Sequence, residues 1–270
     1  MTGASRRDWL RYRKLWFSLL SQGFLRAGAA NSDTHTLALE QIGYPRNLIW
    51  SPGQTRPSTF DVEAFDADVR AGHMAGTNGP VLAVSIDDPD GTAHRPGIAL
   101  PTDVVAPKPG AVLDIWVQAA PWIPFTEVRV FVNGHLVRVT EPFKPPLDPY
   151  VLTSDTFDPT DYFGTALRKA HVQIPLSVLT ASVASGDAWL IVEAGYPAWT
   201  GETLDAPDPP DSDGDGLPDL DDADIPTRPP SAADPSFDLA AIAPGVSPTA
   251  FSNPFLLDLN GDGVWQAPGL

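Results

Sequence analysis

An acidic run in the last third of the chain has the spacing of a calcium-binding loop. Five carboxylates and one backbone carbonyl stand where such a loop supplies its ligands, at Asp211, Asp213, Asp215, Leu217, Asp219 and Asp222. Gly216 occupies the place at which the chain must turn sharply around the ion. Oxygen ligands at this spacing suit a hard divalent cation, so the run predicts a Ca²⁺ site. The alternative is an acidic, solvated linker, because Asp222 is shorter than the usual bidentate Glu.

The end of the chain repeats the first half of this pattern. Asp258, Asn260 and Asp262 are spaced like the first three ligands of a calcium loop. The later ligand positions fall on Gln266 and Gly269, which makes this the weaker calcium candidate. A β-turn between two terminal strands is the alternative, since Asn-Gly and Asp-Gly pairs are sufficient for a turn.

A third group of residues with possible chemistry is the triplet Asp33-Thr34-His35. Taken alone, the triplet is a weak metal signal, and a capped turn with a polar histidine is the simpler interpretation. The other four histidines are expected to be surface or strand residues: His73, His94, His135 and His171. The chain has no cysteine, which excludes disulfides, thiolate metal sites and thiol nucleophiles.

Several short motifs surround this triplet in a fixed order. They are Trp16 to Gly23, Ser32 to Thr36, Gly43-x-Pro45-Arg46, Val69 to Gly72, Thr77 to Pro80, Val117 to Ile123, Val128 to Gly134, Asp187 to Val192, Asn253-Pro254-Phe255 and Asp258 to Gly263. In this order they resemble the bacterial PHP-type metallohydrolases (polymerase and histidinol phosphatase domain) of the CehA/McbA-like branch. The acidic run at 211–222 is in turn similar to thrombospondin type 3 and dockerin-like calcium loops.

The resemblance implies that the chain is the C-terminal portion of a metal-dependent hydrolase that cleaves phosphoesters or related esters. In PHP proteins a distorted α/β barrel gathers His, Asp and Glu around two or three metal ions such as Zn²⁺ or Mn²⁺. Asp33 and His35 would be the last ligand pair of that centre. Two ligands hold such ions poorly, and the His-x-His segment that opens a PHP barrel is absent from this chain. We therefore expect no activity from the chain alone. Its expected partner is the missing N-terminal barrel segment, or none if the chain is a homologue that has lost the activity.

Two other functions fit the same sequence. One is a non-enzymatic calcium-binding β-sandwich module with a structural or binding role. The other is carbohydrate binding, indicated only by the aromatic residues Trp116, Trp122, Trp189 and Trp199. Alternation along the strands would place Trp116 and Trp189 in the packing of one face, so a core role is expected for both.

The charge and hydropathy of the chain argue against two classes of partner, nucleic acid and the membrane interior. The chain has 34 acidic and 17 basic residues and a formal net charge of -17, which argues against binding to nucleic acid. No stretch approaches the roughly 18 apolar residues of a membrane span. The basic N-terminus lacks the features of a signal peptide. Weak calcium binding is useful only where calcium is millimolar, so an extracellular or periplasmic location is expected.

The order of elements predicts a mainly β protein: an immunoglobulin-like β-sandwich preceded by a partial α/β segment. Residues 1–75 are expected to be the barrel remnant, with a helix that ends near Gly23 and a second helix at 57–72 capped by Ser58. Residues 76–200 are expected to form the sandwich, 201–250 an acidic linker with the calcium loop, and 251–270 a terminal strand and turn. Strands are expected at 48–50, 81–86, 112–118, 127–132, 135–139, 168–174, 188–193 and 255–259. Asn133-Gly134 predicts a type I′ hairpin turn.

Overall fold

The computed structural model of the protein describes residues 6–32, 34, 43–53, 56–120, 123, 127–137, 150–151, 168–183, 186–195 and 248–269. The helical elements of this part are α1 Arg6–Ser21, η1 Pro57–Thr59, α2 Val62–Ala71 and α3 Leu176–Leu179. Its strands are β1 Arg46–Ile49, β2 Met74–Thr77, β3 Val81–Asp87, β4 Ala93–His94, β5 Val104–Val105, β6 Val112–Ala119, β7 Glu127–Val132, β8 His135–Leu136, β9 Tyr150–Val151, β10 Arg168–Pro175, β11 Ala188–Gly195, β12 Thr249–Ser252 and β13 Phe255–Leu257. The protein is mainly β, as predicted.

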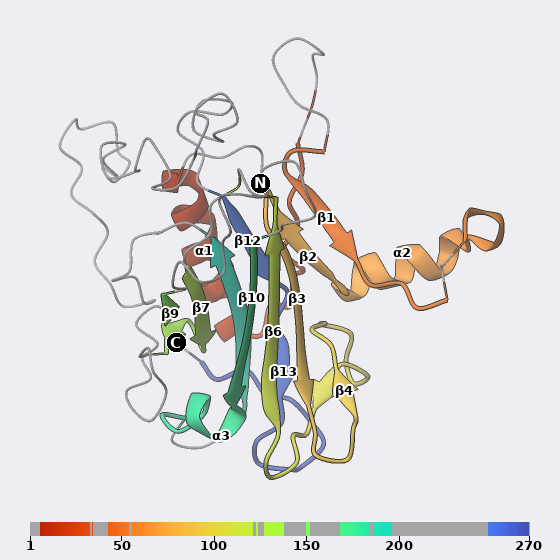
Figure 1. Cartoon of the computed structure of the whole chain (residues 1–270). Helices are drawn as coiled ribbons and strands as arrows, with labels where there is room; N and C mark the ends of the chain where they lie inside the picture. The colour runs from red at the N-terminus through yellow and green to blue at the C-terminus, as the bar shows by residue number, and fades with distance from the viewer. Residues whose placement is uncertain are drawn as a thin grey trace.

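The strands form two sheets (Figure 1). The smaller sheet has four antiparallel strands in the order β10-β6-β3-β4. The larger, nine-stranded sheet is built around β11, which pairs with β7 along one edge and with β12 and β13 along the other. β12 pairs onward with β2 and then β1, while β13 pairs in parallel with β5.

One apolar core lies between the two sheets. Successive side chains of a strand point to opposite faces, so alternate residues of each inner face enter this core. The four-stranded sheet contributes Leu82, Val84, Ile86, Leu113, Ile115, Val117, Val172 and Ile174. The larger sheet contributes Val128, Val130, Val132, Leu190, Val192, Phe255 and Leu257. The remaining residues of β6, among them Trp116, face away from the core.

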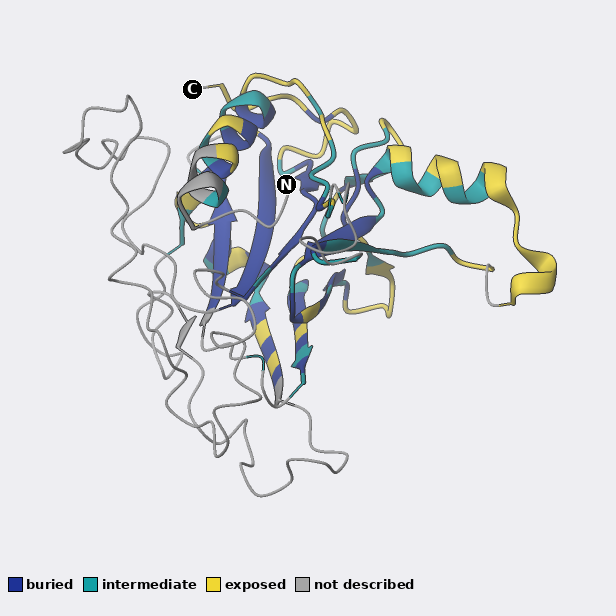
Figure 2. Cartoon of the chain, turned by 90° about the horizontal axis from the view of Figure 1, so that it is seen from above, coloured by how far each residue is buried: buried dark blue, intermediate teal, exposed yellow. Residues whose placement is uncertain are grey.

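Helix α1 covers the other face of the nine-stranded sheet and creates a second core (Figure 2). Its buried residues Trp16, Phe17 and Leu20 pack against side chains from β7, β11, β12 and β13, namely Phe131, Trp189, Ile191, Phe251 and Leu256. All eight residues of β11 are buried. A strand that is covered on both faces is nearly all apolar, which explains the run Trp-Leu-Ile-Val in β11.

The predicted strands and the hairpin are confirmed, with shifts of one or two residues at the described ends, while residues 138 and 139 of the strand expected at 135–139 lie outside the described residues. Strands β2, β4, β5, β9 and β12 were not predicted. Asn133 and Gly134 have φ of 51° and 84°, the positive pair that a type I′ turn requires. The cap predicted for the second helix is wrong. Asp61, not Ser58, caps α2, because the Asp61 side chain accepts hydrogen bonds from the backbone N–H groups of Glu63 and Ala64.

The boundary expected between residues 75 and 76 falls inside β2. This strand pairs with β1 on one side and with β12 on the other. Residues before 76, the central strand β11 and residues after 248 therefore belong to one sheet. None of the helices in the described ranges is long and apolar enough to cross a membrane.

Candidate functional site

Residues 51–72 form an arm that projects from the edge of the larger sheet (Figures 1 and 2), with 54 and 55 outside the described residues. The arm contains η1 and α2, and it ends at Gly72, whose φ of 74° closes the helix in the left-handed conformation. No residue of α2 is buried. Two apolar side chains at the start of the helix, Phe60 and Val62, are 47% and 61% exposed.

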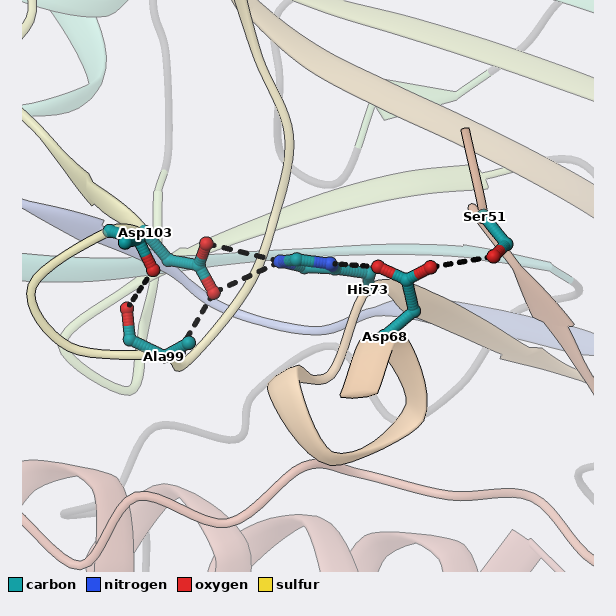
Figure 3. Close-up of polar contacts among 6 residues, drawn as sticks. Ser51, Asp68, His73, Ala99 and Asp103 are labelled. Carbon is teal, nitrogen blue, oxygen red and sulfur yellow. Dashed lines mark hydrogen bonds and ion pairs between the residues drawn. The ribbon is translucent and has the colours of Figure 1, made fainter. Parts of the chain in front are cut away.

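Four side chains at the base of the arm form a chain of hydrogen bonds, here called the His73 cluster: Ser51, Asp68, His73 and Asp103 (Figure 3). The Ser51 hydroxyl donates to Asp68 Oδ2 at 2.6 Å. His73 Nδ1 lies 2.9 Å from Asp68 Oδ1, and His73 Nε2 lies 3.0 Å from Asp103 Oδ1. Asp103 Oδ2 also accepts the backbone N–H of Ala99 at 2.7 Å. The cluster thus links the arm, the start of β2 and the loop before β5.

Within the cluster, the hydrogen bonds between His73 and the carboxylates favour the charged forms of His73 and Asp68. Burial alone would lower the pKa of His73, but its hydrogen bonds to Asp68 and Asp103 outweigh burial and raise that pKa above the ordinary histidine value. For Asp68, burial acts to raise the pKa, while the bonds from Ser51 and His73 lower it below the ordinary value. The stable form of the cluster is an imidazolium that donates one N–H to each carboxylate.

Backbone contacts fix the same region. The Trp50 N–H donates to the His73 carbonyl oxygen, and the Ile98 N–H donates to the Ala71 carbonyl oxygen, each at 2.7 Å. Gly97 lies so close to the cluster that a Cβ there would overlap Asp103 and come within 2.8 Å of His73 Cδ2. The two ends of the arm are therefore held to each other and to the neighbouring loop, although the arm itself projects.

The His73 cluster does not have the geometry of a nucleophilic site. The Ser51 hydroxyl donates to Asp68, a carboxylate whose lowered pKa makes it a weak general base for activating the hydroxyl. Both ring nitrogens of His73 are engaged by carboxylates, which leaves neither free to abstract a proton. The arrangement is suited to positioning the arm rather than to catalysis.

A pocket of about 340 Å³ opens beside the cluster, and its lining includes Trp50, His94 and Arg95. The Arg95 guanidinium lies 5.8 Å from the centroid of the Trp50 ring, and its Nη1 donates to the Val84 carbonyl oxygen at 3.0 Å. His94 Nε2 is 3.2 Å from Asp88 Oδ2. The ionisable groups of the pocket are thus bonded within the chain, which identifies the pocket as part of the same structural network.

The predicted ligand pair Asp33 and His35 lies outside the described residues, but the segment leading to it is fixed. The side chain of Asn47 accepts the N–H of Ala30 at 2.8 Å and donates to its carbonyl oxygen at 3.0 Å. Asn253 does the same for Gly28, at 2.7 and 3.3 Å. Two side-chain amides therefore hold this segment against β1 and the β12–β13 connection as an added strand would be held.

All six predicted ligands of the main calcium loop, Asp211 to Asp222, also lie outside the described residues. The weaker candidate is described, and its side chains hold a compact turn. Asp258 Oδ1 accepts the N–H of Gly261 at 2.6 Å, and Asp258 Oδ2 accepts the N–H of Gly263 at 2.8 Å. Asn260 and Asp262 each accept the N–H two residues further on, at 2.8 Å. These bonds run from backbone N–H groups to side-chain oxygens, and residues 264–269 do not form the second terminal strand that the β-turn alternative expected. Calcium binding at Asp258, Asn260 and Asp262 stays a prediction.

The His73 cluster was missed at the level of sequence. His73 was expected to be a plain surface or strand residue, and nothing connected it to its partners. Asp68 precedes it by 5 residues across a helix end, while Asp103 follows it by 30 residues. No motif has this spacing, because the three residues meet only through the pairing of β1 with β2 and the path of the following loop.

Comparison with known proteins gives no match: no family model, curated protein or solved structure is similar to this chain at a significant level. Within the described ranges, no group of three or more His, Cys, Asp or Glu side chains is placed to hold a metal ion. Evidence for function therefore comes from the arm, from its fixed base and from the sequence motifs around Asp33 and His35.

Proposed function

We propose that this chain is the C-terminal portion of a PHP-type metal-dependent hydrolase. Its arm docks on the catalytic barrel, and Asp33 and His35 contribute to the metal centre of that barrel. The observation that carries the proposal is the contrast within the arm: its base is held by the His73 cluster, yet no residue of α2 is buried. The chain alone has no hydrolase activity.

A short helix without buried residues needs a partner. Isolated helices shorter than about 12 to 15 residues are marginal in water, and α2 has 10 residues. Phe60 and Phe65 lie with ring centroids 5.2 Å apart, and beside them Val62 is exposed. An apolar surface on a projecting element is typical of an interface. The His73 cluster supports the proposal because a fixed base gives the arm a defined direction at which to meet the barrel.

The path of the chain before Asp33 supports the second part of the proposal. Asn253 and Asn47 hold Gly28 and Ala30, so the chain is fixed next to the sheet up to three residues before Asp33. In the parent enzyme a bound metal would supply an acidified water for ester hydrolysis. Asp33 and His35 would hold the metal as carboxylate and neutral imidazole ligands. The remaining ligands would come from the barrel.

On this proposal the two sheets are an immunoglobulin-like sandwich that carries the arm, and the parent enzyme is extracellular or periplasmic. The second candidate is a non-enzymatic, calcium-binding sandwich module. It is favoured by the rigid attachment of the Asp258 turn, since Asp187 accepts the N–H groups of Leu259 and Gln266 from either side of that turn. A calcium loop attached in this way would stabilise the end of the sheet at which β11 begins.

The DNA that precedes the codon for Met1 separates the two candidates. The hydrolase proposal expects an in-frame barrel sequence with a His-x-His motif, and its absence would leave the calcium module as the better interpretation. That barrel is then produced together with the chain, and complex formation and Mn²⁺-dependent hydrolysis of p-nitrophenyl phosphate are measured. We expect both, with hydrolysis undetectable for the chain alone.

Matched variants distinguish docking from chemistry. Asp33→Ala and His35→Ala should keep the complex and lose hydrolysis, because they remove ligands without altering the arm. The double change Phe60→Ser and Val62→Ser should lose the complex while thermal unfolding of the free chain is unchanged. Val264→Ser is the control, because Val264 is 60% exposed elsewhere on the surface. A complex that tolerates the arm variant would contradict the proposed docking.

A further inference from the structure

The outer face of the four-stranded sheet carries an exposed aromatic side chain among polar ones. Trp116 of β6 is 42% exposed. The register places it between Ala83 of β3 and His171 of β10. Along β6, the flanking positions on the same face are Asp114 and Gln118. The expectation that Trp116 belongs to the core is therefore wrong, whereas Trp189 is fully buried beneath α1 as a core residue.

Asp114 fixes the orientation of the indole ring. Its Oδ2 accepts the Trp116 Nε1–H at 2.9 Å, and its Oδ1 lies 2.8 Å from Gln173 Nε2 and 2.5 Å from His171 Nε2. The imidazole of His171 stacks on the indole, with centroids 3.8 Å apart and planes inclined by 14°. Asp114 itself is 9% exposed. A nearly buried carboxylate thus holds three side chains that would otherwise move freely, so an exposed ring is preorganised.

The second face of the indole is available to a ligand. His171 covers the side toward β10, so the opposite side is turned toward β3, where Ala83 has only a methyl group. Ala83, Trp116 and His171 form one row across the three strands. Gln118, which is half-buried, and Gln173, which is exposed, extend from the same face of the sheet on either side of this row. Their amides can each donate and accept hydrogen bonds at the edges of a ligand that lies on the ring.

We propose that this face, formed by Trp116, His171, Asp114, Gln118 and Gln173, binds a neutral oligosaccharide or polysaccharide. The apolar C–H face of a pyranose ring would pack on the indole, and its hydroxyl groups would bond to the two glutamine amides. The ionisable side chains in direct contact with the indole, Asp114 and His171, are bonded to each other. The charges nearest the ring are thus paired, which suits an uncharged ligand.

A protein partner fits this face less well. Protein interfaces bury several apolar side chains around each aromatic anchor. Here the indole is surrounded by amides, an imidazole and the methyl of Ala83. Among the described residues of β3, β6 and β10, Val81 is the other exposed large apolar side chain. Saccharide sites combine one flat ring with planar polar groups, which is the composition found here. This inference does not depend on the proposed hydrolase function.

The test uses the full chain and four probes: cellohexaose, xylohexaose, mannohexaose and maltohexaose at millimolar concentration. In ¹H–¹⁵N spectra we expect at least one probe to shift the Trp116 indole N–H signal, which is assigned by its loss in Trp116→Ala. Calorimetry with that probe should show affinity lowered about tenfold or more in Trp116→Ala and largely retained in Trp116→Tyr. His171→Ala should weaken binding as well, because the ring then loses its support.

Leu100→Ala is the matched control, since Leu100 is 52% exposed outside this face, and its affinity should equal that of the wild type. Thermal unfolding of each variant establishes that the sheet is intact. The proposal is overturned if none of the four probes shifts the Trp116 signal, or if Trp116→Ala binds as tightly as the wild type. Self-association of the chain that Trp116→Ala abolishes would also overturn it, because the face would then be a protein interface.

Discussion

Arg13 in the first helix and Glu193 in the central strand form a buried ion pair, although 180 residues separate them. Arg13 Nη1 lies 2.9 Å from Glu193 Oε2, and the two side chains are 3% and 1% exposed. The same oxygen accepts Arg129 Nε at 3.1 Å, and the Arg13 guanidinium lies 4.9 Å from the centroid of the Phe131 ring. The pair ties α1 to the middle of the nine-stranded sheet at a single carboxylate.

Glu193→Ala should destabilise the protein strongly. The change removes the carboxylate that two buried guanidinium groups share, and breaking a buried pair from one side costs about 3 to 5 kcal/mol. Urea unfolding followed by tryptophan fluorescence measures the free energy of unfolding. Glu63→Ala, on the exposed surface of α2, should change it by less than about 0.5 kcal/mol. Equal stabilities for the two variants would mean that the ion pair contributes nothing to the attachment of α1.

Phe17→Ala should also be costly, because Phe17 is central to the second core. Its ring lies 5.1 Å from Phe131 and 4.9 Å from Trp189 between centroids, and its side chain is 3% exposed. Truncation of a buried Phe costs about 3 to 5 kcal/mol. Tyr12→Ala in the same helix is the control, since Tyr12 is 50% exposed. A wild-type melting temperature for Phe17→Ala would show that α1 is not part of the cooperative fold.

His73→Gln should reduce stability in a pH-dependent way. The folded-state pKa of His73 is raised above its unfolded value of about 6.5, so its contribution is complete below that pH and is lost as pH rises through the folded pKa. The lowered pKa of Asp68 gives a contribution that is present above about 3.9 and is lost on acidification. The difference in unfolding free energy between wild type and variant should therefore be largest near pH 5 to 6 and shrink toward alkaline pH. Thermal unfolding across this pH range measures the difference, and His135→Gln at an exposed histidine is the control. A difference in unfolding free energy that does not change with pH would argue against an imidazolium in the cluster.

Gly76→Ala should destabilise β2 through a single methyl group. A Cβ at Gly76 would overlap the ring of Phe251 on the neighbouring strand β12. Overpacking of this kind costs about 1 to 3 kcal/mol. The second change Phe251→Leu should recover part of that loss in Gly76→Ala while being destabilising alone, which a double-mutant cycle by urea unfolding would detect. Additive costs would show that the two residues do not compete for the same space.

The acidic run should bind calcium with a dissociation constant of about 10⁻⁴ to 10⁻³ M, as extracellular modules do. Asp211, Asp213, Asp215, Asp219 and Asp222 repel one another without an ion, so calcium is expected to compact the loop. Calorimetry of the full chain measures the heat of binding, and Asp213→Asn with Asp215→Asn should abolish it. Magnesium is the control ion and should bind more weakly, because the loop offers flexible oxygens without a rigid octahedral cage. No calcium-dependent heat at several millimolar would remove this site and, with it, the argument for an extracellular location.

Local sequence signals predicted the longer elements of this fold, whereas the shorter β2, β4, β5, β9 and β12 were not predicted. Alternating apolar residues predicted β3, β6 and β10, and Asn133-Gly134 predicted the turn between β7 and β8, because strand period and turn chemistry are local properties. The helical spacing of Trp16 and Leu20 likewise predicted α1. Local rules were less accurate at the arm. Ser58 and Asp61 are both suitable N-cap residues, and the structure uses Asp61 as the N-cap of α2.

Tertiary structure alone decided which elements meet. Alternation shows that Trp116 and Trp189 each lie on one face of a strand, but only the packing of α1 buries Trp189 and leaves Trp116 exposed. Asp68, His73 and Asp103 have no common motif, and they come together because β1 pairs with β2 and the loop before β5 folds back to the arm. Such contacts depend on strand order and on the closure of long loops, which the local preferences of individual residues do not specify.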